Sequence, residues 1–248
     1  MRFTRAIPPG PDVAPESVWT GMALERGALP HRPYVVCNFV SSVDGRARVE
    51  GRTAKLGGDG DLAVFRLLRT QVDAVMAGTE TLRVERYGVM VGNEERQRLR
   101  VAEGRSEQPL AVIVSRSGRV PFEIPLFADP RSRVALYAPA DTEIPECRAH
   151  VQRYPLPTDP QSQLADVLRS LRDDHDVRSL LCEGGPTVFE ALLAQELVDE
   201  LFLTLAPSLV GGEPFGITRG PGLRPARDLR LVSALARDSH LFLRYARP

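Results

Sequence analysis

Three short segments rich in glycine and hydroxyl side chains each follow a strand-like apolar run, and each has the chemistry to hold a phosphate group. In Glu183-Gly184-Gly185-Pro186-Thr187, two glycines let backbone N–H groups approach an anion closely. Pro186 suits the first turn of a helix whose N-terminus attracts a pyrophosphate, and Thr187 adds a hydroxyl. A tight turn that packs a helix on a strand would use the same glycines, so both interpretations stay open.

The second and third segments repeat this chemistry. Gly78-Thr79-Glu80-Thr81 places a glycine and two hydroxyls after a strand, although Thr79 or Thr81 could instead cap a helix. Ser115-Arg116 sets a hydroxyl beside a guanidinium, a pair that can hold a phosphate monoester, although an ordinary polar turn is its commoner use. In open parallel sheets, ligands bind beyond the carboxyl ends of the strands, where all three segments would lie.

Two carboxylates complete the candidates. Asp61 stands at the head of an amphipathic helical pattern, from which it could point into a pocket and bind a pair of N–H groups of a heterocycle. A capping or first-turn interaction with the helix dipole is the commoner use of such a residue. Asp44 precedes Gly45 in a turn, and a purely local turn role is the alternative for it as well.

The elements that must position these residues alternate between strands and helices. Apolar runs of strand length predict strands at 33–40, 72–77, 110–114, 134–138 and 179–182. Helical spacing predicts helices from Asp59 onward, over 161–174 and after Pro186. Residues 46–49 form a short alternating pattern, and 200–210 and 230–245 are strand-like.

This alternation predicts an α/β protein in which helices flank a central, mostly parallel mixed sheet with antiparallel strands at its C-terminal edge. Residues 1–32 are rich in proline and glycine and are predicted to be an irregular lead-in, with a short helix near residues 16–25. Residues 33–248 are predicted to form a single domain, within which 154–160 is a connection.

Composition excludes several classes of protein. Of 248 residues, 43% are hydrophobic and 26% charged, a balance typical of a soluble globular chain. The 32 basic and 32 acidic residues cancel, so neither nucleic acid nor a membrane is an expected partner. Because no apolar stretch approaches the ~18 residues of a membrane span and the N-terminus lacks a signal-like region, we expect a cytoplasmic protein. Three distant cysteines and four scattered histidines argue against disulfides and a metal site.

Four pieces of the sequence carry a resemblance to a known family. They are Ser42-Val43-Asp44-Gly45, Gly78-x-x-Thr81, residues 181–187, and residues 198–207 followed by Gly211-Gly212. From about Tyr34 to its end, the chain resembles the reductase domain of the riboflavin-biosynthesis deaminase-reductases, within the dihydrofolate-reductase-like superfamily. Dihydrofolate reductases are similar more distantly, at residues 61–66, 112–117 and 183–185.

The resemblance implies NADPH as the cofactor. It places three residues along the cofactor phosphates: Gly78, Thr79 and Thr81. Ser115 and Arg116 would meet the 2′-phosphate and favour NADPH over NADH. A further five would surround the pyrophosphate and the nicotinamide half: Glu183, Gly184, Gly185, Thr187 and Val188. Gly45, in the loop 42–45, would border the nicotinamide.

The resemblance also implies a substrate site made by Asn38, Ser42, Asp44, Asp61 and Arg86. Asp61 is the predicted catalytic residue, with the task of orienting the substrate. The family often has lysine where this chain has Asn38, and Asp-Asp-Pro-Arg where this chain has Glu85-Arg86-Tyr87-Gly88. There is no H-x-E and no P-C-x-x-C, so the zinc-dependent deamination of the family's other half is excluded here.

Three functions stay open from the sequence. The first is NADPH-dependent reduction of a ribosylaminopyrimidine 5′-phosphate to its ribityl product, with Arg83 or Arg86 available for the substrate phosphate. The second is reduction of dihydrofolate or another pterin, whose guanidine-like edge would bind Asp61. The third is an NADPH-binding protein without catalysis. The resemblance further implies a homodimer, in which the strand-rich C-terminal part would pair across a two-fold axis.

Overall fold

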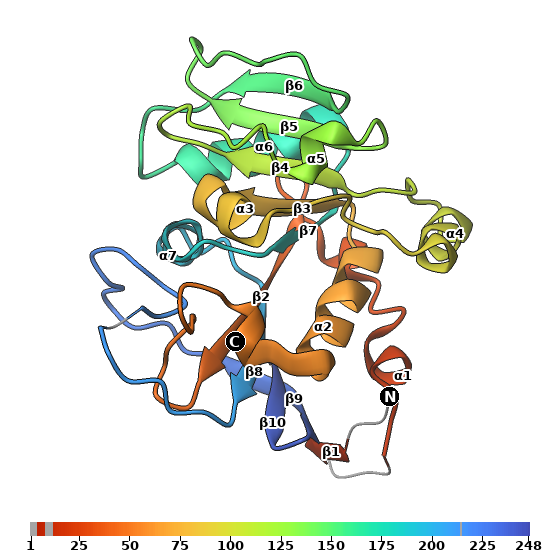
Figure 1. Cartoon of the computed structure of the whole chain (residues 1–248), viewed down its shortest axis with the longest axis vertical. Helices are drawn as coiled ribbons and strands as arrows, with labels where there is room; N and C mark the ends of the chain where they lie inside the picture. The colour runs from red at the N-terminus through yellow and green to blue at the C-terminus, as the bar shows by residue number, and fades with distance from the viewer. Residues whose placement is uncertain (1–3, 8–11, 214) are drawn as a thin grey trace.

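A ten-stranded sheet runs through the computed structural model, which describes residues 4–7, 12–213 and 215–248 (Figure 1). The strand order is β1-β9-β10-β8-β2-β7-β3-β4-β5-β6. The strands are β1 (Thr4–Ile7), β2 (Tyr34–Ser42), β3 (Ala74–Gly78), β4 (Leu110–Val114), β5 (Arg133–Ala138), β6 (His150–Pro155), β7 (Ser179–Cys182), β8 (Glu200–Ala206), β9 (Arg230–Arg237) and β10 (His240–Ala246).

The helices connect these strands and cover the sheet. They are α1 (Pro15–Trp19), the 3-10 turn η1 (Leu24–Gly27), α2 (Ala54–Thr70), α3 (Thr79–Glu85), α4 (Glu94–Ala102), α5 (Pro125–Ala128), α6 (Gln163–His175) and α7 (Pro186–Ala194). Seven strands from β8 to β6 are parallel, while β10 is antiparallel to both β8 and β9. The predicted α/β fold, with its mixed sheet and antiparallel C-terminal edge, is therefore confirmed.

Two apolar layers hold the sheet between its helices. The central strands β3, β4 and β7 are buried along their whole length, as is typical of parallel strands covered on both faces. On one face, Ala111 and Ile113 of β4 pack with residues of α1, α2, α3 and α5. On the other face, Val112 and Val114 pack with residues of α6 and α7. This alternation fixes which side chains at each strand end face which layer.

The predicted elements differ from the structure in several places. The helix predicted from Asp59 belongs to α2, which starts five residues earlier at Ala54 and is interrupted at Gly58, whose φ is +63°. Glycine tolerates this left-handed conformation, and the interruption explains why regular helical spacing begins only after it. Residues 46–49 form no strand, only an isolated bridge between Val49 and Arg52.

The sequence patterns also missed β1, β6, α4, α5 and η1. Strand β6 and helix α4 consist mostly of polar and charged residues, so neither shows a clear apolar period. Strand β6 also includes the start of the predicted connection at 154–160. The helix predicted near residues 16–25 is shorter and is followed by η1. Part of the predicted irregular lead-in forms β1, which pairs with β9 at the edge of the sheet. The domain boundary at residue 32 stays a prediction.

Candidate active site

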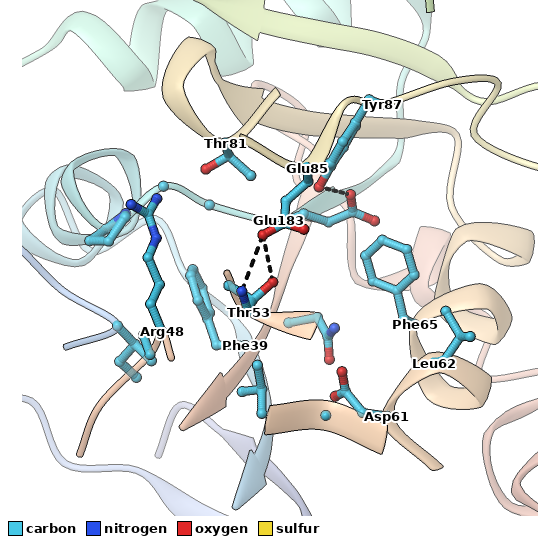
Figure 2. Close-up of a pocket in the computed structure, with 18 of the residues that line it drawn as sticks. Phe39, Arg48, Thr53, Asp61, Leu62, Phe65, Thr81, Glu85, Tyr87 and Glu183 are labelled. Atoms are coloured by element: carbon cyan, nitrogen blue, oxygen red, sulfur yellow. Dashed lines mark hydrogen bonds between the residues drawn. The ribbon is translucent and has the colours of Figure 1, made fainter. Parts of the chain in front are cut away.

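Two adjoining cavities lie at the carboxyl ends of the parallel strands. Cavity I, of about 500 Å³, lies between the end of β2, the first half of α2, the end of α3 and the turn that follows β7 (Figure 2). Cavity II, of about 510 Å³, lies beyond β3 and β4 and is bordered by the N-termini of α3 and α7. Because parallel strands end together at one edge of a sheet, loops far apart in sequence meet here.

Cavity I contains three of the residues predicted to bind substrate, Asn38, Asp61 and Arg86. The Asp61 carboxylate accepts a hydrogen bond of 2.6 Å from the hydroxyl of Thr204 on β8. Burial raises the pKa of Asp61, and the Thr204 hydrogen bond opposes this increase. No Arg or Lys of the described part of the chain forms an ion pair with Asp61, and the charge of the His240 imidazole also acts to lower the pKa of this carboxyl.

The Asn38 amide lies at the same end of cavity I, one strand away from Thr204. Its side-chain oxygen is buried and has no hydrogen-bond partner within the described residues. An unsatisfied buried carbonyl costs free energy that a ligand N–H group can recover. Together with Asp61, it gives this end of the cavity acceptors suited to the N–H groups of a polar heterocycle.

Glu183 also lines cavity I, but its carboxylate is already paired. Both of its oxygens accept hydrogen bonds of 2.7 Å from Arg69 of α2, and the Tyr87 hydroxyl donates another of 2.8 Å. Burial lowers the pKa of Arg69, but the Glu183 carboxylate outweighs it and the pKa rises above its ordinary value. The Glu183 side chain therefore joins α2 to the end of β7, while its predicted contact with the cofactor stays a prediction.

The Gly184-Gly185 turn forms the boundary between the two cavities. The peptide between the two glycines is cis, and Gly184 has a φ of +107°, which favours glycine. The Gly184 carbonyl accepts a hydrogen bond of 2.8 Å from the N–H of Gly78. A Cβ on Gly185 would lie 3.1 Å from the Thr81 hydroxyl, so the two predicted phosphate-binding turns touch each other.

Cavity II contains most of the residues predicted to bind the cofactor. Its walls include Gly78, Thr79, Thr81, Arg116, Gly185, Thr187 and Val188. The N-terminus of α7, with Gly185 as its N-cap residue, points backbone N–H groups toward this cavity. The three predicted turns therefore converge on one cavity with hydroxyl, amide and guanidinium donors.

Ser115 departs from this pattern, because it is buried and lines neither cavity within the described residues. Side chains alternate along the end of β4, so Val114 and Arg116 face the layer of α6 and α7, and Ser115 faces the opposite layer. The hydroxyl that reaches cavity II beside Arg116 is that of Ser117.

Ser42, Asp44 and Gly45 also lie outside the described walls of both cavities. The Asp44 carboxylate accepts hydrogen bonds from the Ser42 hydroxyl and from the N–H groups of Val210 and Gly211. These bonds, that of the Ser42 hydroxyl first, lower the pKa of Asp44 to about 2. Asp44 thus fastens its own turn to the loop after β8, and its substrate contact stays a prediction.

That loop supplies residues that sequence patterns did not single out. Phe215 lines both cavities, Ile217 lines cavity I and Arg219 lines cavity II. The N–H of Ala47 donates a hydrogen bond of 2.8 Å to the Phe215 carbonyl, which holds the loop against the segment after β2. Arg48, on that segment, lines both cavities as well. The sequence feature that could have indicated this loop is an aromatic residue surrounded by several glycines.

The geometry suits two ligands of different chemistry. Cavity II has donors and positive charge for an elongated phosphate-containing molecule, whereas one end of cavity I has acceptors for a heterocycle. In the described parts of the chain, no cluster of His, Cys, Asp or Glu could hold a metal ion. Within the same residues, no helix is long and apolar enough to span a membrane.

Comparison with known proteins identifies relatives over most of the chain. The family described as the RibD C-terminal domain matches residues 33–243. The 2,5-diamino-6-ribosylamino-4(3H)-pyrimidinone 5′-phosphate reductase of Archaeoglobus fulgidus is 31% identical over 183 residues, which cover 73% of this chain and 83% of that protein. The enzyme of the same name from Methanothermobacter thermautotrophicus is 27% identical, over 73% of this chain and 81% of that protein.

Solved structures share the fold. A pyrimidine reductase-like protein from Corynebacterium diphtheriae superposes with a TM-score of 0.76 at 22% identity, covering 93% of this chain and 97% of that one. The riboflavin biosynthesis reductase Rib7 of Saccharomyces cerevisiae has a TM-score of 0.68 at 16% identity, covering 93% and 98%. At these identities the similarity establishes the arrangement of strands and helices.

Proposed function

The chain belongs to the RibD C-terminal domain family, and on that premise we propose that it is an NADPH-dependent reductase of a ribosylaminopyrimidine 5′-phosphate. The reaction would convert the ribosyl group to ribityl: the sugar ring opens to an imine, a hydride adds to C1′, and a proton adds to the imine nitrogen. The observation that carries the proposal is that cavity II, lined by hydroxyl and guanidinium groups, and cavity I, with carboxylate and amide acceptors at one end, share a wall that includes Thr81 and Gly185.

The residues of cavity II fit NADPH. Arg116 and Arg219 line it without an ion-pair partner among the described residues, so both guanidiniums are available to phosphate groups. The single carboxylate in its wall, Glu80, is paired with Arg83 at 2.7 Å. When bound, NADPH supplies the hydride. The N–H groups at the start of α7 and the hydroxyl of Thr187 would hold its pyrophosphate.

The residues of cavity I would orient the substrate. Asp61 and Asn38 offer acceptors for the N–H groups of the pyrimidine, and Arg86 offers a cation for the phosphate. Phe39 lies under the Gly184 turn, where a Cβ on Gly184 would be 3.2 Å from its ring. Holding the two reactants in one geometry and excluding water is the main contribution expected of the protein, because the cofactor supplies the difficult chemistry.

The direct test is turnover of 2,5-diamino-6-ribosylamino-4(3H)-pyrimidinone 5′-phosphate with NADPH. We expect NADPH absorbance to fall and the ribityl product to appear by mass spectrometry. Binding of NADPH without turnover of this compound, or of its deaminated uracil counterpart, would contradict the proposal.

Dihydrofolate is the second candidate substrate, because Asp61 is a carboxyl at the end of cavity I that forms no ion pair with an Arg or Lys of the described residues. Such a group can bind the amino group and ring N–H of a pterin. The same assay with dihydrofolate in place of the pyrimidine separates the two candidates. Turnover of dihydrofolate alone would reverse their order.

We further propose that the protein is a homodimer through the face of β8, β9 and β10 opposite the one that packs with α2. Leu203, Leu205 and Leu243 are only half-buried on this face, and Leu241 is 38% exposed. An apolar sheet face of this kind is expected to bury itself against a second copy. Light scattering should give twice the mass of the chain, and Leu241→Glu should shift the population to monomer. A monomeric parent protein at micromolar concentration would refute the proposed dimer.

A further inference from the structure

Arg48 lies on the wall that the two cavities share. The residues that line both are Arg48, Thr81, Gly185, Pro186 and Phe215, and within the described residues Arg48 is the charged member of this set. It comes from the segment after β2, and Figure 2 shows its side chain on the opposite side of cavity I from Phe65. Any charge at this position acts on the ligands of both cavities.

The Arg48 guanidinium is held weakly. Its central carbon lies 4.2 Å from the centroid of the Phe215 ring, a cation–π contact. Among the described residues, no carboxylate lies within 4 Å of it, and its side chain makes no hydrogen bond. Arg69, in contrast, already donates hydrogen bonds to Glu183 and to the Met90 carbonyl. Within the described part of the chain, Arg48 therefore keeps its five N–H donors for ligands, and its guanidinium is held by the Phe215 ring.

The cost of ordering this side chain has a consequence for binding. Immobilising a long side chain costs about 0.5–1.5 kcal/mol of conformational entropy, and the first ligand that hydrogen-bonds to it bears that cost. A second ligand, on the other side of the shared wall, then meets a guanidinium that is already in place. A planar guanidinium suits this role, because its two edges can bind two different partners.

We infer that Arg48 couples the two sites, so that occupancy of cavity II by the dinucleotide strengthens binding of the phosphorylated substrate in cavity I. The inference rests on the proposed function, because it needs both ligands to be anionic. It adds a role for a residue that neither the family motifs nor the predicted site contains. By linkage, the substrate must strengthen dinucleotide binding by the same factor.

The experiment measures the dissociation constant of the pyrimidinone ribosylamino phosphate by calorimetry, with the enzyme free and with the enzyme saturated by NADP+. The oxidised dinucleotide has no hydride to give, so the ternary complex is stable. We expect NADP+ to lower the substrate dissociation constant about 2- to 10-fold, which corresponds to the ordering cost of one side chain. In Arg48→Gln, this ratio should fall to about 1.

Two matched variants separate coupling from simple binding. Arg86→Gln, in the wall of cavity I alone, should weaken the substrate equally with and without NADP+. Arg219→Gln, in the wall of cavity II alone, should weaken NADP+ equally with and without substrate. Retention of the parent ratio in Arg48→Gln, or a ratio of 1 in the parent enzyme, overturns the inference and leaves the proposed function standing. A parent enzyme that binds neither ligand contradicts the proposed function itself.

Discussion

Cavity I and cavity II differ in the kinds of groups that form their walls. Many of the residues in the walls of cavity II directly follow strands β3, β4 and β7, and the donors of this cavity are backbone N–H groups, hydroxyls and guanidiniums. The walls of cavity I are formed by side chains from segments as far apart as Asn38 and Glu183, and several of these are buried and paired with each other. The first cavity depends on side-chain packing, whereas the second depends on where strands end.

This difference indicates how each cavity responds to change. A buried charge pair that supports a cavity is part of the stability of the fold, and removing one partner leaves the other uncompensated. A guanidinium at the rim of a cavity contributes to ligand binding and little to folding. Four substitutions test this contrast, from the largest expected effect to the smallest.

Arg69→Ala should destabilise the protein by about 3–5 kcal/mol, because it leaves the Glu183 carboxylate buried without its cation. Urea unfolding monitored by circular dichroism measures this change. The double variant Arg69→Met with Glu183→Gln should recover part of the loss, since it removes both charges. A loss under about 1 kcal/mol for Arg69→Ala would show that the pair is not what supports cavity I.

Asp61→Asn should lower kcat roughly 10²-fold or more while the NADPH dissociation constant stays unchanged. Stopped-flow turnover and fluorescence titration measure the two quantities. Asp59→Asn is the control, because Asp59 lines the same cavity from the same helix but is exposed. If both variants lose the same factor in kcat, Asp61 has only a local role in the helix.

The same substitution should stabilise the fold at neutral pH. Burial raises the pKa of Asp61 in the folded state, so the ionised carboxylate carries a penalty above that pKa and none below the ordinary unfolded value of about 4. Asp61→Asn should therefore melt higher than the parent near pH 7, and the difference should vanish as the pH falls below about 4. The parent's activity should likewise decline as the pH falls through the raised pKa.

Arg116→Ala should weaken NADPH about 10- to 100-fold, the effect of losing a hydrogen bond to a charged group, and should change NADH binding much less. Its melting temperature should match that of the parent, which is the contrast with Arg69. Arg119→Ala is the control, since Arg119 is also exposed in the same loop but lies outside the described walls of cavity II. Equal weakening of both dinucleotides would refute the 2′-phosphate assignment.

Gly57→Ala should lower kcat about 10-fold, although it removes no polar or charged group from the cavity. A Cβ at this position would lie 2.2 Å from one Asp61 carboxylate oxygen, so the carboxylate must move. Gly88→Ala, in the wall of the same cavity, adds a Cβ 3.7 Å from its nearest neighbour and should have little effect. If the two variants have equal activity, the position of the Asp61 carboxylate does not limit turnover.

The sequence predicted cavity II better than cavity I, for a physical reason. Strand ends and glycine turns are local patterns, so Gly78, Thr81 and Gly185 could be assigned to one cavity before their contacts were known. Ser115 was placed in that group, but alternation along β4 directs its side chain to the other layer. A shift of one residue along a strand moves a side chain to the opposite face of the sheet, and the residue types at a strand end do not determine which face each one takes.

Of the five residues predicted to bind substrate, three line cavity I: Asn38, Asp61 and Arg86. The partners of Glu183 could not be predicted, because Arg69 is one arginine among many and lies 114 positions away in the chain. Long-range pairing of this kind depends on the packing of α2 against the sheet, which no local pattern encodes. The loop that carries Phe215 was missed for the same reason.

The position of β7 has a consequence for biosynthesis. This strand fills the centre of the sheet between β2 and β3, yet more than two-thirds of the chain precedes it. While the polypeptide emerges from the ribosome, β2 and β3 are therefore synthesised long before the strand that joins them, and their inner edges lack their final hydrogen-bond partner. Contacts of such long sequence separation form slowly, so a nascent chain of this protein is most prone to aggregation just before residue 179 becomes available.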